Sequence, residues 1–539
     1  MIFTPLKAFA SQHETRTLIN RLQYYPWIIF IIAVASYIFL YSPYGLDNGD
    51  GGFILGLSHQ LYLGQRLYDE IIYVRPPVTP ILHSFVFYPP FSFAPVFIDR
   101  AFFFLQVATY SALPALIAGS YFKWGISFTA SIGLIAFLFS AHSFPPMAWH
   151  TVDGLFFSAL SLYFLLPLSN RIGSRYVYIS IVSSLLAAGS KQPYAIIPVI
   201  VIFMTFYSGR SVTINLIYKL SITVVCTLIL VYMTYGADYL SRALSAISGQ
   251  SRLSDLYEAG ILDYLRDIKI LGRDNLALIT SCFFLLCYIE LANFRKCQSF
   301  FAILAITGIL GYLYLFYIKI TQWDNPTYFF DTIFILTFGY AAIKAIKLRT
   351  EVWGFIVALH TVAWASSISW GYLTTSLFLT PSVITIGHFV WMGKYDRTAS
   401  RILFILIASS FYNVFYIAHS FIYNLDGAVI LRDAKYGLTD VNPAFRYIYA
   451  TQHQRETYLE LRSIADKIES TNFVVLPNFP FARLFTGSGV SPIGVDWALN
   501  AEIGKFYPEV LLRLNNVMYA VVYKTPFPSI EEKVNSVQT

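Results

Sequence analysis

Residues 44–52 read YGLDNGDGG, and residues 64–77 read GQRLYDEIIYVRPP, with a short apolar run between them. Four acidic residues fall within this stretch, Asp47, Asp50, Asp69 and Glu70. Asp50 directly precedes apolar residues whose spacing, at 53, 57, 61 and 63, predicts a helix lying on a membrane surface. Asp is also a favoured N-cap and Asp-Gly a common turn, so the local sequence equally fits a structural role for Asp50.

The whole chain around this stretch has the composition of a membrane protein. Of its 539 residues only 12% are charged, about half the roughly 25% of soluble domains, whereas 56% are hydrophobic and 18% aromatic. This excludes an ordinary cytosolic protein. The net charge is +7. In a membrane protein such an excess of basic residues usually lies in cytoplasmic loops, so no nucleic-acid partner is predicted.

Apolar runs of spanning length predict about thirteen transmembrane helices. The first, Tyr25–Tyr41, is interpreted as an uncleaved signal anchor. The others lie near residues 100–121, 124–141, 152–168, 175–189, 193–208, 214–235, 274–293, 299–319, 328–345, 352–370, 372–392 and 402–423. Basic residues alternate between successive loops, which predicts a cytoplasmic N-terminus and an extracytoplasmic C-terminus.

Three outer regions follow from this topology: residues 43–98, residues 236–272 and the tail from 424. The tail contains an amphipathic helical pattern at 461–468 and two strand-like runs at 473–476 and 519–522. We therefore expect a transmembrane module at 1–423, with surface-lying helices in its first outer loop. A small extracytoplasmic α/β domain is expected at 424–539.

The first loop resembles that of the GT-C superfamily of membrane glycosyltransferases, which use polyprenyl-phosphate-linked sugars. These include protein O-mannosyltransferases, the lipid A aminoarabinose transferase and lipopolysaccharide galacturonosyltransferases. The matching features are Asp50, then Gly64, then Leu67-Tyr68-Asp69, then Arg75-Pro76-Pro77. Residues 149–154 and the turn at 191–193 are also similar. Many relatives carry a second acid directly after the first, where this chain has Gly51, so Asp47, Asp69 or Glu70 could supply that carboxylate.

The resemblance implies an all-α, polytopic GT-C fold. It also implies transfer of a hexosyl or pentosyl group to a hydroxyl, with inversion of the anomeric carbon, at the outer face of the plasma (inner) membrane. Asp50 would be the base, assisted by Asp69 or Glu70. Arg75 and Lys191 would bind the lipid phosphate. A cell-envelope glycan or lipid, as in lipopolysaccharide, is the expected acceptor. No cofactor is predicted, although a divalent ion held by Asp47, Asp50, Asp69 or Glu70 stays open as an alternative.

Three further residues are candidates for sugar or acceptor contacts, Asp47, His150 and Trp323. Each also fits a structural role, in a turn, at the membrane interface or in an aromatic belt. Two other functions would share the many spans: a transporter or flippase of a lipid-linked sugar, and a polysaccharide polymerase or ligase. A transporter predicts charges near the bilayer midplane. A polymerase predicts a large late outer loop instead of this early motif.

Overall fold

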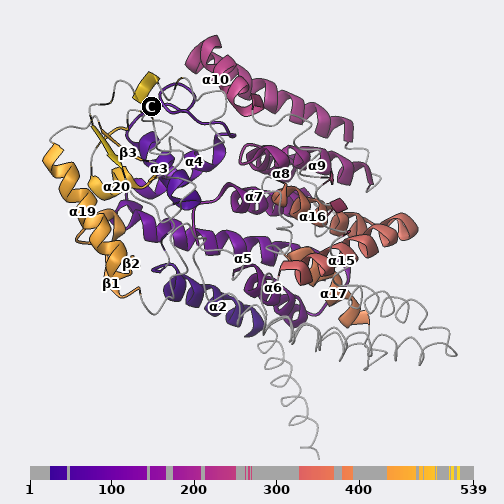
Figure 1. Cartoon of the computed structure of the whole chain (residues 1–539). Helices are drawn as coiled ribbons and strands as arrows, with labels where there is room; N and C mark the ends of the chain where they lie inside the picture. The colour runs from indigo at the N-terminus through magenta and orange to yellow at the C-terminus, as the bar shows by residue number, and fades with distance from the viewer. Residues whose placement is uncertain are drawn as a thin grey trace, which may run out of the picture.

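The computed structural model describes the chain in segments (Figure 1). They are residues 25–44, 46, 49–141, 146–165, 174–207, 213–249, 261–262, 265–266, 269, 327–368, 379–392, 434–468, 473–476, 479–487, 489–491, 493, 509, 512–514, 517 and 519–522. Within them helices predominate, and the strands form two small sheets.

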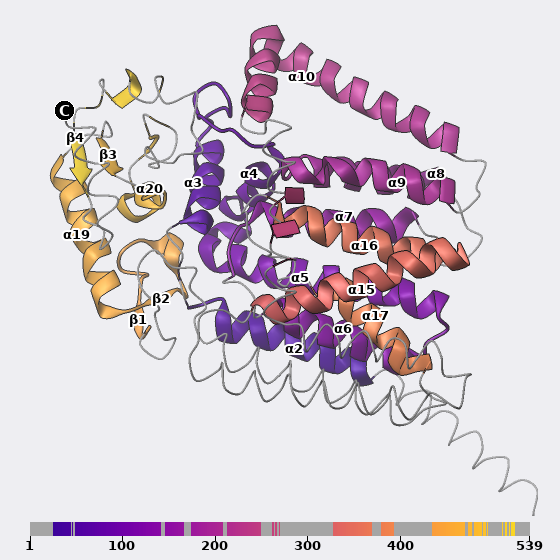
Figure 2. The same ribbon diagram turned by 45° about the vertical axis from the view of Figure 1, so that its right-hand side comes forward.

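The main body is a bundle of helices that run side by side in both views (Figures 1 and 2). Its members are α2 (Tyr25–Tyr41), α5 (Pro95–Tyr121), α6 (Ile126–Ala141), α7 (His150–Leu165), α8 (Ser174–Ala188), α9 (Ile196–Tyr207), α10 (Thr213–Gly249), α15 (Thr327–Leu348), α16 (Glu351–Ser367) and α17 (Thr380–Met392). Each overlaps one of the predicted spans, and α10 continues beyond its span. The runs at 274–293, 299–319 and 402–423 lie outside the described residues.

Two stretches of the described helices are long and apolar enough to cross a membrane, Pro95–Tyr121 and Ile217–Ile247. Several others are apolar but shorter, including α2 and α6. The helices are therefore where the sequence predicts them, whereas the count of thirteen spans is not confirmed.

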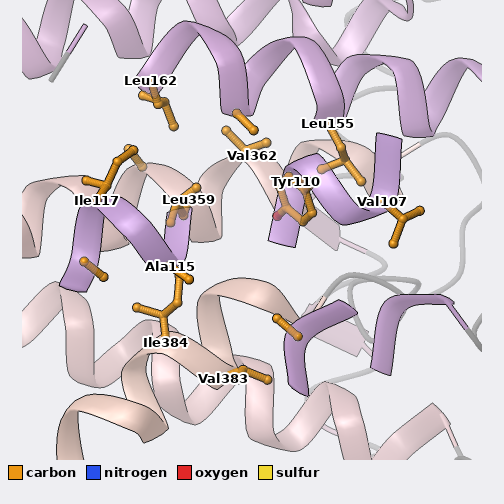
Figure 3. Close-up of a cluster of buried hydrophobic side chains, with 14 of the residues drawn as sticks. Val107, Tyr110, Ala115, Ile117, Leu155, Leu162, Leu359, Val362, Val383 and Ile384 are labelled. Atoms are coloured by element: carbon orange, nitrogen blue, oxygen red, sulfur yellow. The ribbon is translucent and has the colours of Figure 1, made fainter. Parts of the chain in front are cut away.

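The bundle core is built from helices that are apolar on more than one side. Figure 3 shows residues of α5, α7, α16 and α17 meeting there: Val107, Tyr110, Ala115, Ile117, Leu155, Leu162, Leu359, Val362, Val383 and Ile384. Small residues bring the helices close together. At Gly387 an added Cβ would lie 2.5 Å from Ile132, so α17 packs directly on α6.

The first loop forms α3 (Asp50–Tyr62), α4 (Val78–His83) and the 3₁₀ turns η1 (Ser84–Phe87) and η2 (Phe91–Phe93). Most of the apolar residues of the first helix are covered by other parts of the protein. Leu57 packs in a cluster with Tyr73 and Ala246, while Leu55 packs against the C-terminal tail. Tertiary contacts thus bury most of α3, whereas Tyr62 and Leu63 at its C-terminal end are exposed, and a position at the membrane surface stays a prediction.

Helix α10 changes direction at Gly236, whose φ of +87° is outside the helical range. Gly236 directly follows residue 235, where the predicted span ends. The region expected to be an outer loop from 236 therefore begins as a second helical segment. Ala243 and Ala246 of this segment pack on the first loop.

The tail contains the expected amphipathic helix, α19 (Gln452–Ile468), with Leu461 buried. The two expected strands are also present, and β3 (Phe473–Leu476) pairs in parallel with β4 (Tyr519–Val522). A second pair, β1 (Tyr436–Gly437) and β2 (Tyr449–Ala450), is antiparallel, and η8 (Pro443–Phe445) and α20 (Ala482–Thr486) complete the described tail.

The tail shares one hydrophobic core with the first loop. Phe445, Phe481 and Phe485 of the tail belong to the same buried cluster as Leu55 and Val86. Backbone contacts reinforce it, because the Tyr449 N–H donates to Pro43 O over 2.8 Å. The predicted domain boundary near 423 lies outside the described residues and stays a prediction.

Candidate functional site

The loop that carries Arg75 is held by backbone and side-chain hydrogen bonds on both sides. The Tyr68 hydroxyl donates to Arg75 O over 2.6 Å, and Tyr68 itself has a left-handed φ of 66°. The Gln192 amide donates to Val74 O over 3.2 Å. The loop therefore has a fixed path against the turn between α8 and α9.

The contact between the start of α4 and the turn after α8 requires a glycine at position 189. The Val78 N–H donates to Gly189 O over 2.9 Å, and a Cβ at 189 would lie 2.5 Å from Val78 Cγ2. A larger residue at 189 would push α4, which begins at Val78, away from this turn.

The guanidinium of Arg75 contacts His150, the first residue of α7. Its Nη1 lies 2.9 Å from Nε2 and 3.1 Å from Nδ1 of the ring. A guanidinium has donors only, so the ring nitrogen that it meets must accept, and His150 is a neutral imidazole in this arrangement. The His150 side chain is buried, whereas Arg75 is half-buried.

Lys191 contacts the same turn of α7. Its Nζ donates to Thr151 Oγ1 over 3.1 Å and to Ser366 O of α16 over 2.8 Å. Lys191 is buried, and both it and Arg75 are close enough to act electrostatically on His150. Three residues predicted separately from the sequence, Arg75, His150 and Lys191, are thus brought together.

Tyr194 also contacts this turn of α7, and the close packing of its ring requires a second glycine. Its hydroxyl donates to Thr151 O over 2.7 Å. A Cβ at Gly154 would overlap the Tyr194 ring. The small residue at 154 therefore lets the turn that carries Lys191 pack closely on α7.

Asp50 is the first residue of α3, and Gly49 occupies the N-cap position. Asp50 is therefore not the N-cap that the local sequence allowed. The first turn of α3 lies beside the Arg75 loop, since the rings of Phe53 and Tyr73 are 6.1 Å apart. On its other side an added Cβ at Gly52 would lie 3.0 Å from Phe481, so the tail covers this turn.

Asp69 and Glu70 lie in a surface network of ion pairs. Asp69 pairs with Arg66 at 2.5 Å and with Arg242 of α10 at 2.9 Å. The Arg66 N–H donates to Glu70 Oε2 over 2.7 Å. From the tail, Arg513 donates to Asp69 O over 2.9 Å. The Asp69 side chain thus links the first loop to α10, and its backbone carbonyl links the loop to the tail. The catalytic role of both acids stays a prediction. Asp47 and Trp323 lie outside the described residues.

A buried polar cluster next to this site was missed by the sequence reasoning. His83 contacts Asp99 of α5 through Nδ1 and Asp153 of α7 through Nε2, the latter over 3.1 Å. Gln106 of α5 donates to the same oxygen of Asp153 over 2.6 Å. A signal was available, because ionisable residues at 99 and 153 are surrounded by apolar sequence.

The charge state of His83 follows from its neighbours. Burial by itself would lower its pKa, but Asp153 and Asp99 outweigh burial and raise the pKa to about 10. His83 is therefore an imidazolium at neutral pH, with both ring N–H groups donating to carboxylates.

Within the described residues, no three or more His, Cys, Asp or Glu side chains are grouped so that they could hold a metal ion. Asp47 and the Asp50 side chain lie outside this part of the chain, whereas Asp69 and Glu70 lie within it.

No protein-family model and no curated protein matches the sequence. Among solved structures, the chain is similar to the oligosaccharyltransferase of Archaeoglobus fulgidus, in a crystal structure of its complex with zinc and sulfate. Identity is 11% and the TM-score 0.43; the similarity covers 86% of this chain and 62% of the archaeal one. The chain thus spans less than two thirds of that protein, and a similarity at this level does not define a shared fold.

Proposed function

We propose that the chain is a membrane glycosyltransferase of the GT-C kind, which moves a sugar from a polyprenyl-phosphate-linked donor to a hydroxyl. The observation that carries the proposal is the convergence of Arg75, His150 and Lys191 at the first turn of α7. These residues come from three distant segments. Two cationic side chains gathered in a mostly buried place suit an anionic group that loses its water on binding.

In the proposed reaction the bond between the anomeric carbon and the donor phosphate breaks, and a bond from that carbon to the acceptor oxygen forms. The acceptor proton passes to the carboxylate of Asp50, and the polyprenyl phosphate leaves with the electron pair. Attack opposite the leaving group inverts the anomeric carbon. The role of Asp50 is supported by its place in the first turn of α3, beside the Arg75 loop.

Arg75 and Lys191 would stabilise the charge that develops on the leaving phosphate. The planar guanidinium can donate two parallel hydrogen bonds to phosphate oxygens, and the ammonium adds a compact charge. The neutral ring of His150 would orient the guanidinium or contact the sugar. Asp69, Glu70 and Asp47 are proposed as the alternatives for the assisting carboxylate, and Trp323 as a sugar contact.

The proposed setting is the plasma membrane, with the site and the tail on the extracytoplasmic face and the N-terminus in the cytoplasm. The apolar composition and the two stretches of spanning length support the membrane setting, and the alternation of basic residues between loops supports the orientation. In this setting the bundle would hold the polyprenyl chain while the sugar projects toward the first loop. A cell-envelope glycan or lipid would be the acceptor.

The experiment compares surface glycans by mass spectrometry in cells that lack the gene and are complemented with variants. We expect the unchanged protein to restore a glycan with one additional sugar residue, and Asp50→Asn to leave it absent. Asp466→Asn is the matched control, because Asp466 is an exposed acid on α19. Full restoration by Asp50→Asn at equal membrane abundance would contradict the role of Asp50.

A further inference from the structure

The segment at 75–83 meets the first turn of α7 at two separate points. At its start, the Arg75 guanidinium contacts His150; at its end, His83 contacts Asp153. His150 and Asp153 are three residues apart, so they share one face of α7. Arg75 and His83 are joined by Pro76-Pro77 and the short helix α4, which leave little freedom between the two contacts.

Helix α5 holds the second contact, between His83 and Asp153, in place. Asp99 and Gln106 lie seven residues apart on one face of this helix. Asp99 contacts Nδ1 of His83, and the Gln106 amide donates to Asp153 Oδ1. All four side chains of this cluster, His83, Asp99, Gln106 and Asp153, are buried. One histidine ring therefore connects α4 to α5 and α7 at once.

The ring also separates two buried carboxylates. Two such groups on opposite sides of one ring repel each other unless a cation lies between them. Oδ2 of Asp153 has no hydrogen-bond partner among the described residues, so this carboxylate depends strongly on the His83 charge. The raised pKa of His83 agrees with that geometry.

We propose that His83 is a positioning residue: as a cation held between Asp99 and Asp153, it fixes α4 against α5 and α7 and thereby keeps Arg75 against His150. This rests on the proposed function, because it assigns Arg75 to a phosphate site. His83 itself contacts neither substrate nor reacting atoms.

A neutral residue at 83 would leave the two carboxylates uncompensated. Their repulsion and hydration would move the end of α4 away from α7. Because Pro76-Pro77 resists bending, the displacement would reach Arg75 and the hydrogen bond from Val78 N–H to Gly189 O. The guanidinium would then approach phosphate in the wrong orientation.

The test uses the purified full-length chain in lipid nanodiscs, with farnesyl phosphate as the probe. We expect His83→Gln to weaken farnesyl phosphate binding by about tenfold or more, the effect of losing an oriented charge-assisted contact. The double variant His83→Gln/Asp99→Asn restores the net charge of the cluster and should recover binding to within about threefold of the unchanged protein.

The matched control is His360→Gln, which alters another buried histidine, hydrogen-bonded to Thr337 in the bundle. It should lower stability without changing farnesyl phosphate affinity. Equal affinity of His83→Gln and the unchanged protein would overturn the proposal. So would an equal loss in His83→Gln and His360→Gln, since that pattern reflects general destabilisation.

Hydrogen exchange provides a readout that does not depend on ligand binding. We expect His83→Gln to increase exchange in peptides covering residues 73–79, which include the Val78 N–H, whereas His360→Gln leaves them unchanged. If the unchanged protein fails to bind farnesyl phosphate, the proposed phosphate site is wrong. The exchange result then decides the positioning role by itself, and unchanged exchange in His83→Gln would overturn it.

Discussion

The guanidinium of Arg75 lies 2.9 Å from Nε2 of His150, although 75 residues separate them in the chain. This pair joins the first loop to α7 at the turn that Lys191 also contacts. The contact gives Arg75 a defined direction, which a phosphate site needs and a mobile surface arginine lacks.

The orientation of Arg75 gives the first prediction. Arg75→Lys keeps the charge but loses the planar fork, so farnesyl phosphate affinity should fall by about tenfold, and Arg75→Ala should reduce it further. Microscale thermophoresis on purified protein measures both. Arg446→Ala, at an exposed tail position, is the control. Undiminished affinity in Arg75→Ala would remove Arg75 from the phosphate site.

The second prediction concerns the close contact between Gly154 and Tyr194. In Gly154→Ala the new methyl group overlaps the ring, so the unfolding free energy should fall by about 1–3 kcal/mol. The matched control is Gly339→Ala on α15, where an added Cβ meets no atom within 4 Å. Thermal unfolding followed by intrinsic fluorescence compares them. A Gly154→Ala protein as stable as Gly339→Ala would contradict the described packing.

The third prediction is a pH dependence of stability that comes from His83. Burial lowers its pKa, but Asp153 and Asp99 raise it further, to about 10 in the folded protein against 6.5 in the unfolded chain. A raised folded pKa means that this stabilisation is complete below pH 6.5 and is lost as the pH rises through 10. The melting temperature should therefore fall over this range.

His83→Gln isolates that contribution, because it cannot bind the extra proton. At pH 6.5 the variant should be less stable by about 3–5 kcal/mol, the usual cost of removing one partner from a buried ion pair. The difference in melting temperature from the unchanged protein should shrink toward pH 10. A difference that stays constant with pH would show that His83 is not the titrating group.

The fourth prediction tests whether the tail supports the first loop. Phe485 is buried in the shared core and stacks on Phe445, with ring centroids 4.2 Å apart. Phe485→Ala should cost about 3–5 kcal/mol and increase hydrogen exchange in residues 84–98 of the first loop. Leu512→Ala, at a largely exposed tail position, should change neither. A Phe485→Ala protein with normal exchange in that loop would indicate independent folding.

The fifth prediction separates the two acids of the surface network. Asp69 and Glu70 are partly exposed, so Asp69→Asn and Glu70→Gln should each alter stability by less than about 1 kcal/mol. Loss of sugar transfer in only one variant, at unchanged melting temperature, would identify the assisting carboxylate. Retained transfer in both would leave Asp47 as the proposed partner of Asp50.

The sequence by itself determined the helical class and the position of most described helices. It did so because apolar runs must be buried in lipid or protein whichever neighbours they find. The periodicity of apolar residues in the tail also predicted α19 and the strands β3 and β4. It also identified Arg75, His150 and Lys191 as candidates.

Only the tertiary structure decided which of these residues meet. No pattern in the sequence places Arg75 beside His150, or His83 between Asp99 and Asp153, because these contacts depend on how α4, α5 and α7 pack. The apolar face of α3 shows the same limit. Periodicity indicated that this face must be covered, but only the tertiary structure shows that the tail and α10 cover most of it, since the hydrophobic effect specifies burial and not the partner.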